Sequence, residues 1–244
     1  MLVEASEFVF KASPEIARAR RVLIKPCASY PIPYPVSTSP EMISRIIEGI
    51  REVSDADILI LEGTPGGAPI YPIYQALGYN FPRVLMLDVK DCIWVEVDNP
   101  LPKPFALPTF WIPNVILSSD YLISVSPMKI INNRPEMSVL NLLSTLPSTK
   151  YGNRNPNGWD SLYSIDIDKV MADLYFTLPF DLGIIEARQK FVGKSQQLNQ
   201  GTVEDYGKIF YGDPFDIDNE ACQLLGVKAE YLELIKMARV GFEA

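Results

Sequence analysis

The chain has 244 residues, of which 48% are hydrophobic, so it can bury a sizeable core and is not globally disordered. Its formal net charge of −8 argues against nucleic acid as a partner, because neutralising phosphates needs a surplus of Lys and Arg. The N-terminus lacks the basic and apolar regions of a secretory signal, and no apolar run is long enough to span a membrane. We therefore expect a cytoplasmic protein with no membrane partner.

Two residue types narrow the chemistry that is available. The chain has no histidine, which removes the usual general base at neutral pH and any His metal site. Its three cysteines, Cys27, Cys92 and Cys222, are widely spaced, so we expect neither a zinc site nor an iron–sulfur cluster. An odd, sparse set of cysteines is typical of a reducing compartment. Any catalysis would rest on carboxylates, Lys, Tyr, Cys, backbone N–H groups or a hard metal ion.

The first third of the chain alternates between strand and helix signals. A short apolar run from Val22 is typical of a buried strand. After a proline-rich loop, Ser39 and Pro40 predict the start of a helix with an apolar stripe. Strand, helix, strand is the order that builds a parallel sheet. The expected elements are a strand over 22–24, a helix from Pro40 to Val53, a strand over 58–61, a glycine-rich turn over 63–67 and a helix over 70–77.

The middle of the chain contains an unusual segment over 99–114. Its five prolines favour extended backbone, while Phe105, Phe110 and Trp111 need a surface to pack on. We interpret it as an excursion from the domain, and its aromatic side chains make it a candidate surface for a second copy of the chain. The other elements expected here are strands over 84–87, 93–97 and 121–125 and a helix over 138–146.

The last third carries further helix and strand signals and no clear domain boundary. Residues 151–159 are rich in Asn and Gly and predict a mobile loop, and 190–205 are polar and predicted to be irregular. We therefore expect one α/β domain over 1–244, with a mostly parallel central sheet and helices on both faces in three layers. The elements expected here are helices over 166–175, 214–225 and 230–240 and strands over 182–185 and 208–211.

Ligands of open parallel sheets bind beyond the carboxyl ends of the strands, and several polar residues follow predicted strand ends. Lys25 and Lys129 would face one crevice there, as ligand-binding or catalytic groups suited to an acidic ligand, or as surface lysines. Asn141 lies in an apolar segment and either needs buried partners or faces solvent. The backbone of a glycine-rich turn could also approach a ligand, although an ordinary tight turn is the better explanation of these glycines. Its glycines are Gly63, Gly66 and Gly67.

Three carboxylates stand at the start of the helix predicted over 214–225. Asp213 is placed to cap this helix, with a proline in the first turn. Helical periodicity places Asp216 away from the apolar stripe and Asp218 at its margin. We therefore expect Asp216 to be exposed and Asp218 to be half-buried, where a carboxylate needs a cation, a donor or a metal ion.

Taken in order, these segments resemble the family catalogued as domain of unknown function 362. The resemblance implies an α/β fold with a crevice site. Departures from the family pattern include Cys27 in place of Asn, Ile130 in place of His, and Glu186 in place of Asp, and the appended iron–sulfur motifs of some relatives are missing. The segments that carry the resemblance are 22–26, 37–42, 56–63, 119–129, 138–147 and 213–226.

Three functional hypotheses remain open. The first is an enzyme for a small anionic substrate, with the two lysines opposite Glu186 and Asp218 and a hard cation such as Mg²⁺ between those carboxylates. The second is a non-catalytic accessory or interaction protein that uses the same crevice. The third is a thiol function for Cys27, because Lys25 would favour its thiolate form.

Overall fold

The computed structural model describes residues 1–152, 158–194 and 198–243. Most of the loop predicted over 151–159 lies outside these residues. The main sheet has the order β1-β10-β9-β7-β2-β3-β4, and β8 pairs with β7. Its strands are β1 (Leu2–Glu4), β2 (Arg21–Pro26), β3 (Asp57–Glu62), β4 (Val84–Asp88), β7 (Tyr121–Ile131), β8 (Arg134–Glu136), β9 (Leu182–Gly193) and β10 (Gly201–Gly212).

The central part of this sheet is parallel. β2 pairs in parallel with β3 and β7, β3 with β4, and β7 with β9. The strands β10 and β1 then add in antiparallel orientation at one edge. Connections through helices produce the parallel core, which confirms the expected mostly parallel α/β sheet.

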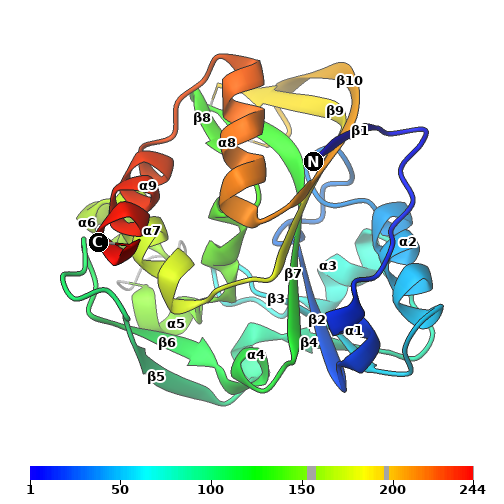
Figure 1. Cartoon of the computed structure of the whole chain (residues 1–244), viewed down its shortest axis with the longest axis horizontal. Helices are drawn as coiled ribbons and strands as arrows, with labels where there is room; N and C mark the ends of the chain where they lie inside the picture. The colour runs from blue at the N-terminus through cyan, green and yellow to red at the C-terminus, as the bar shows by residue number, and fades with distance from the viewer. Residues whose placement is uncertain (153–157, 195–197, 244) are drawn as a thin grey trace.

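Helices cover both faces of the sheet, as predicted (Figure 1). Side chains alternate along β2, so Leu23 packs into one apolar core while Val22 and Ile24 pack into the other. The helices on the Val22 face are α1 (Pro14–Arg18), α2 (Pro40–Arg51) and α3 (Tyr71–Ala76). Those on the Leu23 face include α6 (Asp160–Ile165), α7 (Ile167–Thr177), α8 (Pro214–Leu225) and α9 (Glu230–Glu243).

Helix ends follow the capping signals. The Ser39 side chain accepts from the Met42 N–H at the start of α2, and Asp213 accepts from the first turn of α8. Gly226 ends α8 with a φ of 65°, a left-handed conformation that suits glycine. The helix predicted over 138–146 is instead a 3₁₀ helix, η2 (Leu140–Thr145). A second 3₁₀ turn, η1 (Val89–Asp91), follows β4.

The segment predicted to be irregular over 190–205 was the main error at this level. Residues 190–193 belong to β9 and residues 201–205 to β10, and Gly193 pairs with Gly201 in antiparallel orientation. Residues 195–197 lie outside the described part of the chain. Most residues from Gly201 to Asp205 are exposed, so no apolar alternation marks the strand in the sequence. Backbone pairing with β9 forms the strand without it.

The excursion over 99–114 contributes to a small second sheet. β5 (Trp94–Asp98) and β6 (Thr109–Pro113) pair in antiparallel orientation, and α4 (Asn114–Leu117) follows. The buried carboxylate of Asp173 in α7 accepts the backbone N–H groups of residues 105–107 at 2.7–2.9 Å. The segment is thereby held against the domain, with Phe110 fully buried.

The short helix α5 (Ser148–Tyr151) lies between η2 and α6. Among the described residues, no helix combines the length and the apolar character that crossing a membrane requires.

Candidate functional site

A cavity of about 280 Å³ lies at the carboxyl ends of β2 and β7, roofed in part by η2. This is the place where open parallel sheets bind ligands. Its size is close to the lower end of small-molecule sites, about 300–1,000 Å³. The wall includes Cys27, Ser126, Lys129, Glu136, Asn141 and Asp160.

Lys129 is the only cationic side chain among the described residues of this wall, and it is 6% exposed. Its Nζ lies 3.3 Å from Cys27 Sγ and 3.5 Å from Glu136 Oε2. Burial acts to lower the pKa of Lys129, but the contacts with Cys27 and Glu136 outweigh burial and hold the pKa above its ordinary value. Lys129 is therefore a fixed ammonium at neutral pH. It does not have the lowered pKa of a lysine that acts as a base.

A two-residue turn brings Glu136 to Lys129. Asn132 and Asn133 both have positive φ, 52° and 62°, which Asn tolerates and which matches a two-residue hairpin turn. This turn pairs β8 with the end of β7, so that Lys129 lies opposite Glu136. The Asn-Asn pair is the sequence signal that could have identified Glu136 as part of the site.

Ser126 contributes an unused hydrogen-bonding group to the same cavity. The residue is 1% exposed, and its Oγ has no partner among the described residues. Buried hydroxyl groups usually have a partner, so an unpaired one in a cavity wall marks a place for a ligand or a water molecule. The Cys27 N–H donates to the carbonyl of Val125 at 3.0 Å, so Cys27 and Ser126 lie side by side on neighbouring strands.

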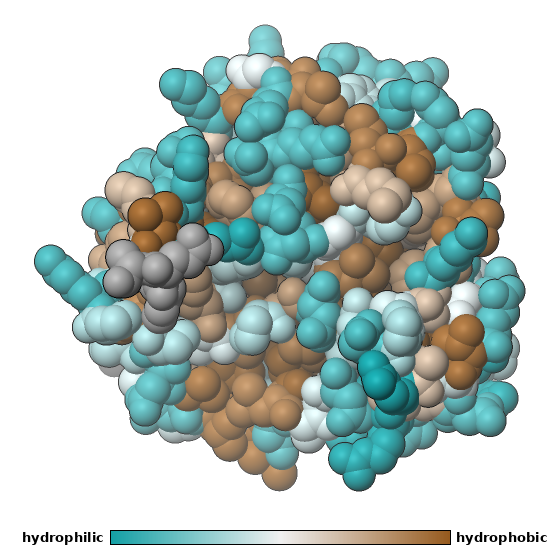
Figure 2. All heavy atoms as spheres, in the orientation of Figure 1, coloured by the Kyte–Doolittle hydropathy of each residue, from teal (hydrophilic) through white to brown (hydrophobic). Residues whose placement is uncertain are grey.

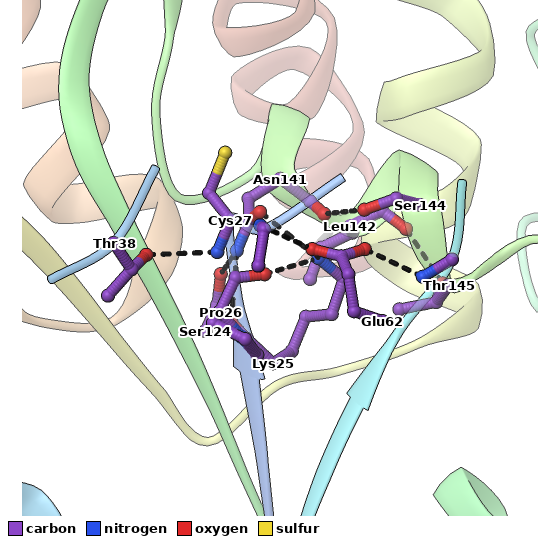
Figure 3. Close-up of polar contacts among 12 residues, drawn as sticks. Lys25, Pro26, Cys27, Thr38, Glu62, Ser124, Asn141, Leu142, Ser144 and Thr145 are labelled. Atoms are coloured by element: carbon purple, nitrogen blue, oxygen red, sulfur yellow. Dashed lines mark hydrogen bonds and ion pairs between the residues drawn. The ribbon is translucent and has the colours of Figure 1, made fainter. Parts of the chain in front are cut away.

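Lys25 is not part of the cavity wall. Its side chain points toward Glu62 and Asn141 (Figure 3). The side chain is fully buried, and its Nζ donates to Pro26 O at 2.7 Å, Glu62 Oε2 at 3.0 Å and Asn141 Oδ1 at 3.1 Å. All three N–H bonds are therefore in use. Glu62 in turn accepts the N–H groups of Ala28 and Gly63.

Asn141 connects this ion pair to the cavity. Its amide donates to Lys25 O at 3.1 Å and to Ser124 Oγ at 3.0 Å. Of the two alternatives left open for Asn141, the structure shows the buried amide with partners. The predicted lysines thus have different roles. Lys25 forms a buried network with Glu62 and Asn141, whereas Lys129 reaches the cavity.

The predicted glycine-rich turn lies beside a different space. Gly63 and Gly67 line a second cavity of about 10 Å³, which is room for about one water molecule. Gly67 has a φ of 67°, and a Cβ on Gly63 would lie 2.8 Å from the Ser144 carbonyl oxygen. The positive φ explains why residue 67 is a glycine, and close packing explains why residue 63 is one. Gly66 lines neither cavity.

Glu186 is fully buried on the α2 side of the sheet. Its carboxylate accepts the Ser39 N–H at 2.9 Å, the Ser39 hydroxyl at 2.6 Å and Arg188 Nε at 3.0 Å. Burial raises the pKa of Glu186, opposed by these hydrogen bonds and by the Arg188 charge. Glu186 anchors the start of α2.

Asp218 is fully buried, and not half-buried as predicted. Its carboxylate accepts the Ser138 and Val139 N–H groups, both at 2.9 Å, and the Tyr231 hydroxyl at 3.0 Å. Burial raises the pKa of Asp218 to about 7, against the opposing effect of these donors. Helical periodicity placed Asp218 at the edge of α8 but could not show that η2 and α9 close over that edge.

The structure does not bring Glu186 and Asp218 together as a pair of metal ligands. Side chains alternate along β9, so Ile184 and Glu186 face α2 while Ile185 faces the core that contains α8. The two carboxylates therefore lie on opposite faces of the sheet and are held by different donors. Within the described ranges, no cluster of three or more His, Cys, Asp or Glu side chains could hold a metal ion.

Comparison with known proteins places these residues in a family. A comparison with curated proteins found no match to the chain. The model of the family described as Domain of unknown function (DUF362) matches residues 22–223, a range that covers β2, β3, β7, η2, β9 and most of α8. This range includes both the buried Lys25 network and the cavity wall. On this match over most of its length, the chain belongs to the DUF362 family.

Proposed function

We propose that the cavity between β2, β7 and η2 binds a small ligand that carries one negatively charged group. The observation that supports this is the presence of two unused donors in one wall. The Lys129 ammonium has three N–H bonds, of which Cys27 and Glu136 use two within the described part of the chain. The Ser126 hydroxyl is buried without a described partner. An acidic oxygen would satisfy both groups.

The charges around the cavity favour a monoanion over a dianion. Glu136 already pairs with Lys129 and adds no uncompensated charge. Asp160 also lines the cavity, and its side chain forms no ion pair with any described residue. A second negative charge on the ligand would be repelled by Asp160, because like charges in a partly desolvated site interact strongly.

Binding of small acids to the purified protein tests this proposal. We would measure butyrate, 2-hydroxybutyrate and succinate by NMR titration against wild type, Lys129→Met and Ser126→Ala, with the exposed Lys228→Met as the matched control. A charge-assisted hydrogen bond contributes about 1.5–3 kcal/mol, so Lys129→Met should weaken monocarboxylate binding roughly 10- to 100-fold. Lys228→Met should bind as wild type does, and succinate should bind more weakly than butyrate.

Two results would overturn the proposal. One is the absence of binding by every acid in the series to wild type. The other is equal affinity in wild type and Lys129→Met while thermal unfolding shows both proteins to be folded.

A further inference from the structure

We infer that Cys27 is a nucleophile that accepts an acyl group from a thioester whose acyl chain carries one carboxylate. The inference rests on the proposed function, because the same cavity would hold the acyl chain. It adds a covalent step and a substrate class to simple binding.

The first support is the environment of the thiol. Cys27 Sγ lies in the cavity wall, 3.3 Å from the Lys129 ammonium. A cation at this distance stabilises negative charge on an attacking sulfur, and that charge makes the sulfur a nucleophile. Glu136 forms an ion pair with Lys129 and lies opposite it across the hairpin. This pairing positions the ammonium group near the sulfur.

The second support is the position of Ser126. An acyl carbon attacked by a thiolate develops negative charge on its oxygen, and a donor aimed at that oxygen lowers the barrier. Ser126 lies beside Cys27 at the ends of β7 and β2, and its buried hydroxyl has no partner among the described residues. When a thioester is bound, this hydroxyl donates to the acyl oxygen, and the spare N–H of Lys129 pairs with the carboxylate of the acyl chain. A carbonyl electrophile uses this group, whereas simple alkylation of the sulfur does not.

The other two cysteines lack this environment and serve as internal controls. Cys92 donates to Asp88 O at 3.3 Å, and burial, together with Asp88 and Asp91, raises the pKa of its thiol to about 11. Cys222 is 4% exposed, and burial, with Asp218 nearby, raises the pKa of its thiol to about 12. Neither cysteine has a cation contact among the described residues.

The proposed step is balanced without an oxidant or a reductant. The Cys27 thiolate attacks the acyl carbon and forms a new S–C bond, and the carbon–sulfur bond of the donor thioester breaks. The departing sulfur leaves with the electron pair and takes a proton from water. A thioester suits the step because the leaving thiolate resembles the attacking one in basicity, so the free-energy change of the exchange is small.

Two reagents separate the role of Lys129 from that of Ser126. Iodoacetamide reports the thiolate alone, and the succinyl thioester of N-acetylcysteamine reports acyl transfer. Each cysteine would be followed at neutral pH by peptide mass spectrometry in wild type, Lys129→Met, Lys129→Arg and Ser126→Ala. Cys27→Ser verifies the modified position, and thermal unfolding shows which variants are folded.

In wild type, we expect Cys27 to be alkylated at least about tenfold faster than Cys92. Lys129→Met should slow both reactions of Cys27 about tenfold or more, while Lys129→Arg keeps most of the alkylation rate because it keeps the positive charge. Ser126→Ala should leave alkylation unchanged and slow acylation roughly 100- to 1,000-fold, the effect of removing one oxyanion donor.

The inference is overturned if Cys27 in the folded wild type reacts no faster than Cys92, or if the thioester leaves no acyl group on Cys27. It is also overturned if Ser126→Ala slows alkylation and acylation equally. Butyrate binding to Cys27→Ser distinguishes this failure from that of the proposed function. Binding without acylation refutes the nucleophile alone. Acylation without butyrate binding refutes the proposed function, and with it the carboxylate-bearing substrate class, but leaves Cys27 as a nucleophile.

Discussion

The buried charged residues of this protein differ in how many of their hydrogen-bonding groups have a partner. Lys25 and Glu62 lie fully buried at 3.0 Å, with every N–H of the ammonium in use. Such a pair is costly to break, because removing one partner leaves an uncompensated charge in the interior. Lys129 is nearly as buried but has a donor to spare at a cavity. Burial alone therefore does not distinguish a structural lysine from a candidate ligand-binding one. The two are distinguished by the number of ammonium N–H bonds that already have an acceptor.

From the raised pKa of Asp218 we predict that the stability of the folded protein depends on pH. Its pKa is about 7 in the folded protein and 3.8 as its ordinary value, so the folded state binds this proton more tightly than the unfolded state. The stabilising contribution is complete below about pH 4 and is lost as the pH rises through about 7. A pKa difference of this size corresponds to roughly 4 kcal/mol.

The measurement is the free energy of unfolding by urea at pH 5 and pH 8 for wild type and Asp218→Asn. Other groups titrate equally in both proteins, so the variant should lose less stability between these two pH values. The exposed Asp216→Asn is the matched control and should behave as wild type does. An identical pH dependence in wild type and Asp218→Asn would show that Asp218 is ionised throughout this range.

At the scale of elements, β7 is the strand that organises the candidate site. It runs for 11 residues, all of them buried, and carries Ser124, Ser126 and Lys129. Its register with β9 shifts between Pro127 and Met128, after Glu186 on the partner strand. Ser126 and Lys129 both line the cavity, although strict alternation would place side chains three positions apart on opposite faces of the strand.

We predict that Asp173 holds the segment over 99–114 against the rest of the protein. Its carboxylate accepts three successive backbone N–H groups, and an amide in its place would turn an NH₂ group toward one of them. Asp173→Asn should therefore cost about 1–3 kcal/mol of stability and accelerate amide exchange at residues 105–107. Exchange measured by mass spectrometry checks this, with the exposed Asp98→Asn as control. Unchanged protection at 105–107 would mean that packing alone holds the segment.

At the scale of the whole molecule, the aromatic side chains of the segment over 99–114 are buried or half-buried. The face in Figure 2 mixes hydrophilic and hydrophobic areas. Phe110, one of the aromatic residues that suggested docking through 99–114, is buried in the domain, and Trp111 is partly covered by Lys150. Ile93 and Leu117 remain exposed near the small sheet, at 70% and 49%.

We expect a monomer of 27.4 kDa, because single exposed apolar residues do not make a stable interface. Light scattering during size-exclusion chromatography measures this mass directly. A dimer that Ile93→Lys or Leu117→Lys dissociates would instead show that the small sheet docks a second chain. Asp98→Asn, on an exposed position of β5, is the control variant.

Local signals in the sequence predicted much of this protein, because capping, apolar periodicity and strand-to-helix alternation act over a few residues. Ser39 and Asp213 begin their helices as predicted, and the parallel order of β2, β3 and β4 follows from the helices between them. The strand residues 190–193 and 201–205 escaped prediction because cross-strand backbone pairing forms these strands without an apolar pattern.

The candidate site depended on contacts that no local pattern encodes. Sequence placed Lys25 and Lys129 after strand signals, but only the packing of η2 and β8 decided that one is saturated by Glu62 and the other reaches a cavity beside Cys27. The same holds for Glu186 and Asp218, which the sheet separates onto opposite faces. Ion pairs and cavities form between segments far apart in the chain, so their partners are set by how the layers pack against one another.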